Sequence, residues 1–292
     1  MAESEPGRLI PKARPDSIDA FPRHGKEELH ETHHLMHARS VVRSRGRRLR
    51  PGEGEERRVF CWKEQVVLTV AGGTITAVNW NGVSNLGVAD KKTVAAAGGY
   101  GMKKASKLGL EWDQEAANVE AYLLKTQNPG FNKFKQDGTT DAISGASLHV
   151  AVFYSLVNKA LAAGPVPRGI YKKDGWFFKE QPAYDAQTGW KDSVLITVVN
   201  GTIVDVLWNG TSKDAKKKSK LIEALEGRYG MAKAARKGEW NVQAAAVEAA
   251  ILKSQDPAKI NVRSDGTSDA ISGASLHVTA VGLAIEALKA AR

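Results

Sequence analysis

Asp141 to Val150 reads DAISGASLHV, and Asp269 to Val278 reads the same ten letters. Identity over ten residues, 128 positions apart, cannot come from composition. We therefore predict that the chain is an internal duplication whose two copies keep one local chemistry. Each copy comes after a turn-rich approach, DGTT or DGTS, and leads into a run with apolar residues at helical spacing.

The apolar residues after each copy recur at spacings of three and four, which is typical of one face of an amphipathic helix. They are Val150, Phe153, Val157 and Ala160 after the first copy, and Val278, Val281, Ile285 and Leu288 after the second. The decapeptide is therefore predicted to lie at a helix N-terminus. The first backbone N–H groups of a helix lack intrahelical partners and the helix dipole is positive there, so phosphate is the expected ligand.

Small residues in the middle of the decapeptide suit the close approach of an anion. They are Gly145, Ala146 and Ser147 in the first copy and Gly273, Ala274 and Ser275 in the second. The glycine would let the backbone approach the anion, and the serine would present a hydroxyl where a phosphoryl group would rest. In an alternative interpretation, the Asp and Ser residues only cap helices, and SGAS is a tight loop before a core helix.

The motif D-x-x-S-G-A-S resembles D-x-x-[ST]-G-A-[ST], the covalent flavin-attachment motif of the FMN-binding domain family. That family includes the C subunit of sodium-pumping NADH:quinone reductase, the G subunit of Rnf-type complexes and tandem-domain surface lipoproteins of Gram-positive bacteria. The resemblance implies that an FAD:protein FMN transferase joins FMN through its phosphate to the last hydroxyl of the motif, which makes Ser147 and Ser275 the acceptors. The cofactor-binding positions that it implies are Asp141, Ser144, Gly145 and Ala146, and Asp269, Ser272, Gly273 and Ala274.

Two positions depart from the commoner family pattern. The acceptor there is usually Thr, and Ser offers the same hydroxyl nucleophile without the methyl group. The position two residues after the acceptor, often Thr or Ser in the family, is His149 in one copy and His277 in the other. A neutral imidazole there either donates a hydrogen bond to the phosphate or lies in solvent at the edge of the core.

The composition is that of a globular protein. The chain has 292 residues and a mass of 31.5 kDa, enough for two domains, and no apolar run approaches the ~18 residues of a membrane span. The net charge is +10 and the pI is near 9.5, but the lysines are scattered among acids and no recognition motif is found, so no nucleic-acid partner is predicted. The single cysteine, Cys61, excludes an internal disulfide and a cysteine-rich metal site.

Hairpin signals precede the helical part of each copy. Asn200-Gly201 between two β-rich runs is a strong signal for a two-residue hairpin turn, and Gly72-Gly73 takes its place in the first copy. The flanking runs are Val66 to Val70 and Thr74 to Trp80, and Val194 to Val199 and Thr202 to Trp208. Before the second hairpin, residues 169–186 carry aromatic and β-branched residues that indicate one or two short strands.

A second helix is predicted between the hairpin and the decapeptide of each copy. It covers Val119 to Gln127 and Val247 to Gln255, and each stretch stops before a proline. Strands followed by helices favour an α+β fold with an antiparallel sheet in each of two tandem repeats. Four tryptophans recur at matching places and either stack on a flavin ring or pack in the core. They are Trp80, Trp112, Trp208 and Trp240.

The N-terminal segment, residues 1–59, does not resemble the rest of the chain. It has little periodic apolar content, so we predict that it is disordered or unrelated, and it has no apolar stretch typical of a signal peptide. The expected domains are residues 60–164, N-terminally incomplete because no counterpart of the strands at 169–186 is found, and residues 165–292. Four histidines either bind a metal or form a solvated tract. They are His30, His33, His34 and His37.

These features and the resemblance predict an electron-transfer flavoprotein with one covalent FMN in each copy, the second copy being the more complete. The implied partners are the transferase and a membrane or soluble electron donor and acceptor. The implied location is extracytoplasmic, at the membrane or cell surface, and the role is that of a redox carrier rather than a substrate-specific enzyme. Two other functions stay open: a module that holds FMN non-covalently, and a non-redox basic envelope protein in which the decapeptide only caps helices.

Overall fold

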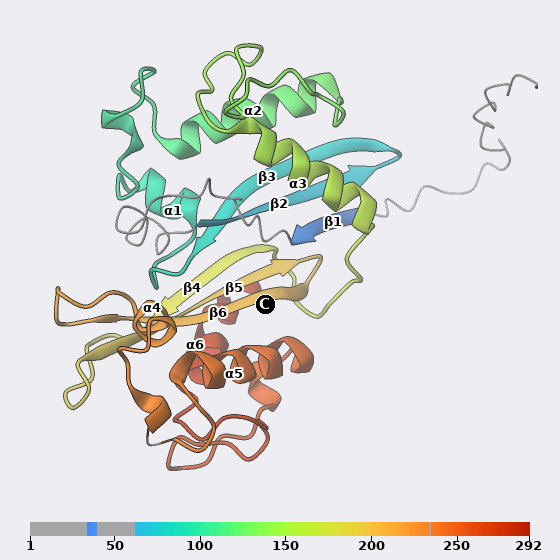
Figure 1. Cartoon of the computed structure of the whole chain (residues 1–292). Coiled ribbons are helices and arrows are strands. Elements are labelled where there is room, and N and C mark those ends of the chain that lie inside the picture. Colours follow the sequence, from blue (N-terminus) through green and yellow to red (C-terminus); the bar gives the residue numbers. More distant parts are fainter. Residues whose placement is uncertain (1–33, 40–61, 234) are drawn as a thin grey trace, which may run out of the picture. The chain divides into compact units, whose positions relative to one another are not determined.

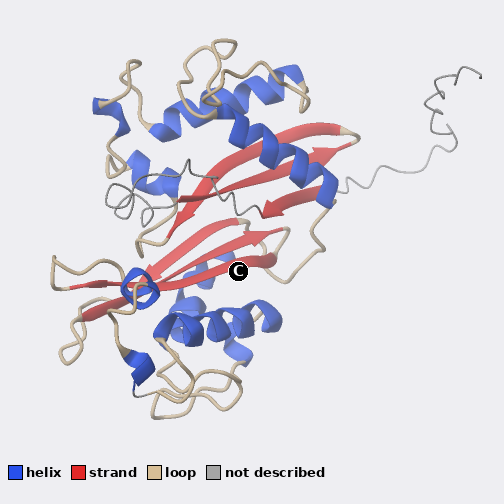
Figure 2. Ribbon diagram, in the orientation of Figure 1, coloured by secondary structure: helices blue, strands red, loops and turns tan. Residues whose placement is uncertain are grey.

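Two three-stranded antiparallel sheets, each covered by helices, form the fold (Figures 1 and 2). The structure, a computed structural model, describes residues 34–39, 62–233 and 235–292, and for 34–39 it describes the backbone alone. The first sheet has the order β1 (His34–Arg39), β2 (Trp62–Ala71) and β3 (Thr74–Ser84). The second has the order β4 (Gly175–Glu180), β5 (Trp190–Val199) and β6 (Thr202–Ser212). The predicted α+β class is confirmed.

Both predicted hairpins are present, and each has the two-residue turn that the sequence predicts between its strands. Gly72 and Gly73 have φ values of 56° and 80°, and Asn200 and Gly201 have φ values of 50° and 69°. Two successive positive φ values match the twist of the flanking strands, which is why Gly and Asn are favoured in such turns. The strands run longer than predicted, to Ser84 in one sheet and to Ser212 in the other.

Strand β1 lies inside the segment for which the sequence predicts no structure. It pairs with β2 so that His34 lies opposite Val70, and β4 pairs with β5 so that Gly175 lies opposite Val198. Each sheet therefore has an edge strand at the same register. The counterpart of β4 is at His34–Arg39 rather than 128 positions before it, because the chain between β1 and β2 is longer than that between β4 and β5. The other residues of segment 1–59, and the side chains of the four histidines, lie outside the described ones.

Helices α2 and α5 begin about two turns before the predicted stretches, because their capping residues lie upstream of the periodic apolar residues. In α2 (Trp112–Thr126), the Glu111 side chain accepts the N–H of Trp112 at 2.9 Å, and the N-cap N–H donates to Gln114 at 2.9 Å, which completes a capping box. In α5 (Trp240–Ser254), Glu239 accepts the N–H of Trp240 at 2.7 Å. The remaining helices are α1 (Lys91–Ala96), α3 (Val150–Ala163), α4 (Lys220–Leu225) and α6 (Thr279–Leu288).

Each sheet packs one face against two long helices. Helix α3 contacts β1 and β2 while α2 contacts β3, and α6 contacts β4 and β5 while α5 contacts β6 (Figure 1). The predicted apolar face of the last helix is confirmed in both halves, since Phe153, Val157, Val281 and Leu288 are buried. The two cores are separate clusters, one in residues 66–160 and one in residues 171–291.

The hairpin strands of the two halves recur at one offset, whereas the short helices α1 and α4 lie 129 positions apart. Trp62–Ala71 and Trp190–Val199 start and end 128 positions apart, as do Thr74–Ser84 and Thr202–Ser212. The described residues nevertheless belong to one compact unit, Thr32–Arg292, so the boundary predicted between 164 and 165 stays a prediction. Among the residues that the structure describes, no helix is both long and apolar enough to span a membrane.

Candidate functional site

The two decapeptides lie in the loops that lead into the last helix of each half. Helix α3 begins at Val150 and α6 begins at Thr279, so both acceptor serines precede the first helical turn and both are exposed. The first amides are already bonded within the protein. The N–H of Val150 donates to the carbonyl of Leu148 at 2.8 Å, and the N–H of Val278 donates to the carbonyl of Gly266 at 2.8 Å. The prediction that these amides point outward toward a phosphate is therefore wrong for the residues named.

The Ser147 hydroxyl is held by a carboxylate from α2. Its Oγ lies 2.9 Å from Oε2 of Glu115 and 3.1 Å from Oε1, and its backbone N–H donates to Oε2 at 2.5 Å. The Ser106 hydroxyl donates to Oε1 of the same carboxylate at 2.8 Å. Glu115 is fully buried, so its charge is balanced by these hydrogen bonds rather than by water.

The Ser275 hydroxyl is held in the same way by an amide. Oε1 of Gln243 accepts the Ser275 N–H at 2.8 Å and lies 3.1 Å from the Ser275 Oγ. The other end of the amide, Nε2, donates to the carbonyl of Gly238 at 3.0 Å. Gln243 is also fully buried, on α5. The two acceptors thus share a geometry but differ in the charge of the residue beneath them.

The glycines of the motif lie against the long helix of their own half. Gly145 has a φ of 73°, and a Cβ there would lie 2.5 Å from Nδ2 of Asn118 on α2, which donates to the Gly145 carbonyl at 2.8 Å. Gly273 has a φ of 96°, and its Cβ would lie 3.3 Å from the Cβ of Ala246 on α5. A left-handed backbone pressed against a helix excludes a side chain, which explains the glycine at each position, and the predicted approach of an anion stays a prediction.

The other motif positions are an exposed aspartate, an exposed serine and a more buried alanine in each copy. Asp141 pairs with Lys135 at 2.6 Å, and Asp269 pairs with Arg263. These ion pairs are exposed and contribute little to stability. Ala146 is buried in the first core and Ala274 is half-buried against the second, whereas Ser144 and Ser272 are exposed.

The alternative interpretation holds in part: SGAS is a turn before a core helix in both copies, but the hydrogen bonds do not support capping by its Asp and Ser side chains. The N-cap residues are His149 for α3 and Val278 for α6, and neither makes a side-chain capping bond. The Asp and Ser side chains of the motif are engaged elsewhere: Asp141 with Lys135 and Ser147 with Glu115.

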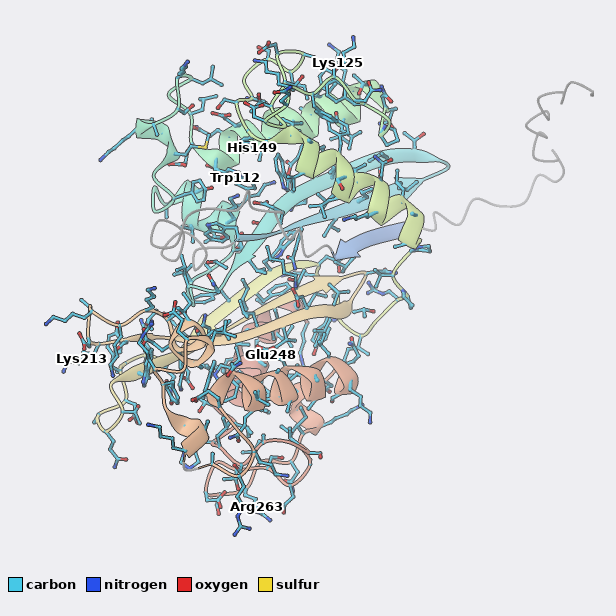
Figure 3. All side chains as sticks on the ribbon, viewed as in Figure 1. Trp112, Lys125, His149, Lys213, Glu248 and Arg263 are labelled. Carbon is cyan, nitrogen blue, oxygen red and sulfur yellow. The ribbon has the colours of Figure 1, made fainter. Side chains whose placement is uncertain are left out.

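A pocket of about 520 Å³ opens beside the first acceptor. Four aromatic side chains, a methionine, the acceptor and three polar groups line it: Trp62, Trp80, Tyr100, Trp112, Met102, Ser147, Glu64, Lys91 and His149. Figure 3 labels Trp112 and His149 on this part of the chain. The volume lies within the roughly 300–1,000 Å³ range of small-molecule sites. An aromatic wall beside an exposed hydroxyl can accommodate a flat ring that is tethered there.

The second half has an equivalent pocket that is smaller. It measures about 210 Å³ and is lined by Trp190, Trp208, Tyr229, Met231, Trp240, Asp192, Lys220 and His277, together with Leu276. Ser275 does not belong to that lining. An adjoining hollow of about 370 Å³ shares Trp190, Tyr229 and Met231 with it, so the two halves differ in whether the serine itself lines the pocket, although the sequence predicts that the second half is the more complete.

Each pocket contains a buried lysine inside its aromatic wall. Nζ of Lys91 lies 4.1 Å from the Trp112 ring centroid, 5.1 Å from that of Tyr100, and 2.5 Å from Oε1 of Glu64. Burial lowers the pKa of Lys91, while the Glu64 carboxylate beside it acts in the opposite direction. Burial likewise raises the pKa of Glu64, against the attraction of Lys91 and a hydrogen bond from Trp80.

The second pocket repeats this arrangement with a shorter acid. Nζ of Lys220 lies 5.1 Å from the Trp240 ring centroid and 2.7 Å from Oδ1 of Asp192. The Trp208 indole N–H donates to Asp192 at 3.3 Å, whereas the Trp80 indole N–H donates to Glu64 at 2.9 Å. A buried ammonium in an aromatic wall thus recurs in both halves.

The four recurring tryptophans serve both as core and as pocket wall. Trp80 and Trp112 are edge to face with centroids 5.3 Å apart, and Trp208 and Trp240 repeat this at 5.2 Å. All four are at most 2% exposed. They therefore form the floor of each pocket, while most of the surface of each ring packs in the core, as the second of the two predicted roles requires.

A third hollow, of about 610 Å³, lies in the second half beside the decapeptide. Gly282 and Val281 of α6, Val262, and His277 are among the residues that line it. The equivalent position of Gly282 in the first half is Tyr154, whose ring stacks on Phe131 at 4.9 Å. The aromatic cluster that Tyr154 forms with Phe131 and Phe134 in the first half therefore has no counterpart beside the hollow.

Four site residues escape the sequence patterns: Lys91, Lys220, Glu115 and Gln243. The lysines are paired only when the alignment of the two copies is shifted by one residue at the short helix after the hairpin, which Lys91 opens in one half and Lys220 in the other. The alignment also pairs Glu115 with Gln243, but nothing in helical periodicity indicates that this position faces the acceptor serine. No cluster of metal-ligating side chains is found among the described residues.

Comparison with protein-family models finds no match, and no curated protein matches either. Among solved structures, the chain is similar to a Clostridium thermocellum protein determined by solution NMR, with 42% identity over 41% of this chain and 92% of that chain and a TM-score of 0.33. It is also similar to the crystal structure of the CPE2226 protein from Clostridium perfringens, with 22% identity over 42% of this chain and 89% of that chain and a TM-score of 0.31. Both are structural genomics targets, and neither description names a ligand or an activity.

Proposed function

We propose that this chain is a duplicated electron-transfer flavoprotein that carries FMN joined through its phosphate to Ser147 and to Ser275. One observation carries the proposal: the exposed Ser147 hydroxyl lines the same pocket of about 520 Å³ as Trp62, Tyr100 and Trp112. A tether at the hydroxyl and an aromatic wall beside it are what a phosphate-linked tricyclic ring requires.

The bound flavin would supply the electron chemistry, and the chain would supply its tether and surroundings. Met102 and the aromatic wall exclude water from one side of the pocket, while Lys91 contributes a positive charge to that wall. A positive charge favours a ring that gains negative charge on reduction, and the carboxyl group of Glu64, 2.5 Å from the Lys91 Nζ, offsets part of that charge. Lys220 gives the second half the same feature.

The tandem organisation belongs to this proposal. The identical decapeptides, the 128-residue offset of the hairpins and the matched register of β1 and β4 support two repeats, residues 60–164 and 165–292, with β1 as an additional strand of the first. Each repeat would hold one FMN. The larger pocket favours Ser147, and the hollow at Gly282 would give a ring tethered at Ser275 additional room.

Maturation would need an FAD:protein FMN transferase, and the function would need a membrane or soluble electron donor and acceptor. We place the protein outside the cytoplasm, at the membrane or cell surface, because a covalent tether prevents loss of FMN where free FMN is scarce. The basic surface suits an anionic wall, membrane or partner. A nucleic-acid partner is not part of the proposal.

The test is coexpression of the full chain with an FAD:protein FMN transferase, followed by denaturing electrophoresis with flavin fluorescence and by intact mass. The wild-type band should be fluorescent and should carry two FMN adducts. Ser147→Ala and Ser275→Ala should each remove one adduct, and the double variant should remove both. Ser155→Ala, which changes an exposed serine on α3, serves as the control and should keep both.

Two outcomes would overturn the proposal. Retention of flavin by the double Ser→Ala variant would refute the site, and a wild-type band without fluorescence would refute covalent attachment. In the second case, yellow native protein would indicate FMN held non-covalently, and colourless native protein would indicate a non-redox protein.

A further inference from the structure

From the contacts of the two acceptors, we infer that Glu115 accepts the proton of Ser147 when FMN is transferred, and that Gln243 cannot do this for Ser275. The two sites are therefore loaded with flavin at different rates. The inference rests on the proposed function and concerns the residue that prepares each hydroxyl.

The Glu115 carboxylate is in place to act as a general base. Both of its oxygens lie within 3.1 Å of the Ser147 Oγ, and the shorter distance is 2.9 Å. A base must lie within hydrogen-bond reach of the proton that it removes, and this one does so without rearrangement. The Ser147 N–H and the Ser106 hydroxyl hold the carboxylate from two other directions, which fixes its orientation.

Gln243 occupies the equivalent position and makes the equivalent contacts. Its orientation follows from its neighbours: the Ser275 N–H can only donate, so the amide oxygen must face it, and Nε2 faces the Gly238 carbonyl. The Ser275 Oγ lies 3.1 Å from that oxygen. A neutral amide accepts a hydrogen bond but does not take a proton near neutral pH. Gln243 therefore keeps the contacts that Glu115 makes with its serine but cannot act as a base.

The transfer step balances with a flavin dinucleotide as the donor. The Ser147 Oγ attacks the phosphorus on the FMN side of the FAD pyrophosphate, a new P–O bond forms, and the P–O bond to AMP breaks. AMP leaves with the bridging oxygen, and the serine proton passes to Glu115. A protonated Glu115 no longer repels the anionic phosphodiester that now lies beside it.

The two halves provide reciprocal variants for the test. In a Ser275→Ala background, Glu115→Gln should lower the kcat of the transferase at Ser147 about a hundredfold with little change in KM, since a general base typically contributes 10²–10⁴-fold. In a Ser147→Ala background, Gln243→Glu should raise kcat at Ser275. Glu115→Gln reproduces the natural Gln243, so it keeps the hydrogen bonds to the serine and is expected to fold.

A structural role would give a different result. If Glu115 only fixes the loop, Glu115→Gln leaves kcat at Ser147 unchanged, and only Glu115→Ala, which removes the hydrogen bonds, reduces loading. That result, or a change confined to KM, would overturn the inference and leave the proposed function intact. A wild-type chain that takes up no covalent flavin at either serine would instead overturn the proposed function.

Discussion

Substitution of Gly145 tests the loop that presents the acceptor. A side chain with a Cβ is strained at the φ of 73° that Gly145 adopts, which lowers the free energy of unfolding by about 1–2 kcal/mol. The new Cβ also displaces the Asn118 amide, and the lost hydrogen bond costs about 1 kcal/mol. Gly145→Ala should therefore lower the free energy of unfolding by about 2–3 kcal/mol. Gly273→Ala meets the Cβ of Ala246 and has no such hydrogen bond to lose, so it should cost about 1 kcal/mol less.

A double-mutant cycle separates the two contributions. Asn118→Ala alone loses the hydrogen bond, about 1 kcal/mol, and also removes the atoms that a new Cβ at position 145 would meet. In the Asn118→Ala background, Gly145→Ala should add only the strain of the left-handed backbone. The double variant then has the same strain and the same lost hydrogen bond as Gly145→Ala alone, so the two should be equally stable. Urea denaturation followed by tryptophan fluorescence measures all four proteins.

The reasoning fails if the two substitutions are additive, because the contact between Asn118 and the new Cβ would then have no energetic consequence. It also fails if Gly145→Ala keeps full stability but loses flavin attachment. That result would return the glycine to the role first predicted for it, the approach of an anion.

Two further predictions concern the pocket and the hollow. Lys91→Met should cost about 3 kcal/mol at pH 7, because it leaves Glu64 buried without its partner. Burial already raises the pKa of Glu64 above 4.5 in the folded wild type, and loss of Lys91 raises it further. The deficit in urea denaturation should therefore be smallest at pH values below the folded-state pKa of Glu64 in the wild type, and it should grow as the pH rises from there to the higher folded-state pKa in the variant; equal deficits at pH 4.5 and 7 would contradict this. Gly282→Ala should raise the free energy of unfolding by about 0.5–1 kcal/mol, because a Cβ there meets open space inside a helix, and a loss of stability would show that this space is already filled.

The sequence predicts the hairpins and the last helices because their signals are local. Asn200-Gly201 sets a turn by itself, and the spacing of Val281 and Leu288 needs only the helical repeat. Strand β1 gives no such signal, because an edge strand is recruited by its neighbour β2 and not by its own composition. The starts of α2 and α5 depend on caps at Glu111 and Glu239, which lie outside the periodic stretch.

The candidate site is predicted in part for the same reason. The decapeptide marks the acceptors, but the partner of each serine is 32 residues upstream, on a helix that tertiary packing brings beneath the loop. The role of Gly145 depends on the same helix, since only the packing reveals that Asn118 occupies the space of a Cβ. A local motif therefore indicates the predicted acceptor and does not indicate which residue of a distant helix contacts it.

The support of each serine from a distant helix limits how the motif could be transplanted. A DAISGASLHV segment grafted onto another scaffold would bring its hydroxyl but leave Glu115 or Gln243 behind. A graft that keeps the contacts of the serine must therefore include both the loop and the helix beneath it. Two grafts with identical loops could then differ in reactivity through one buried side chain.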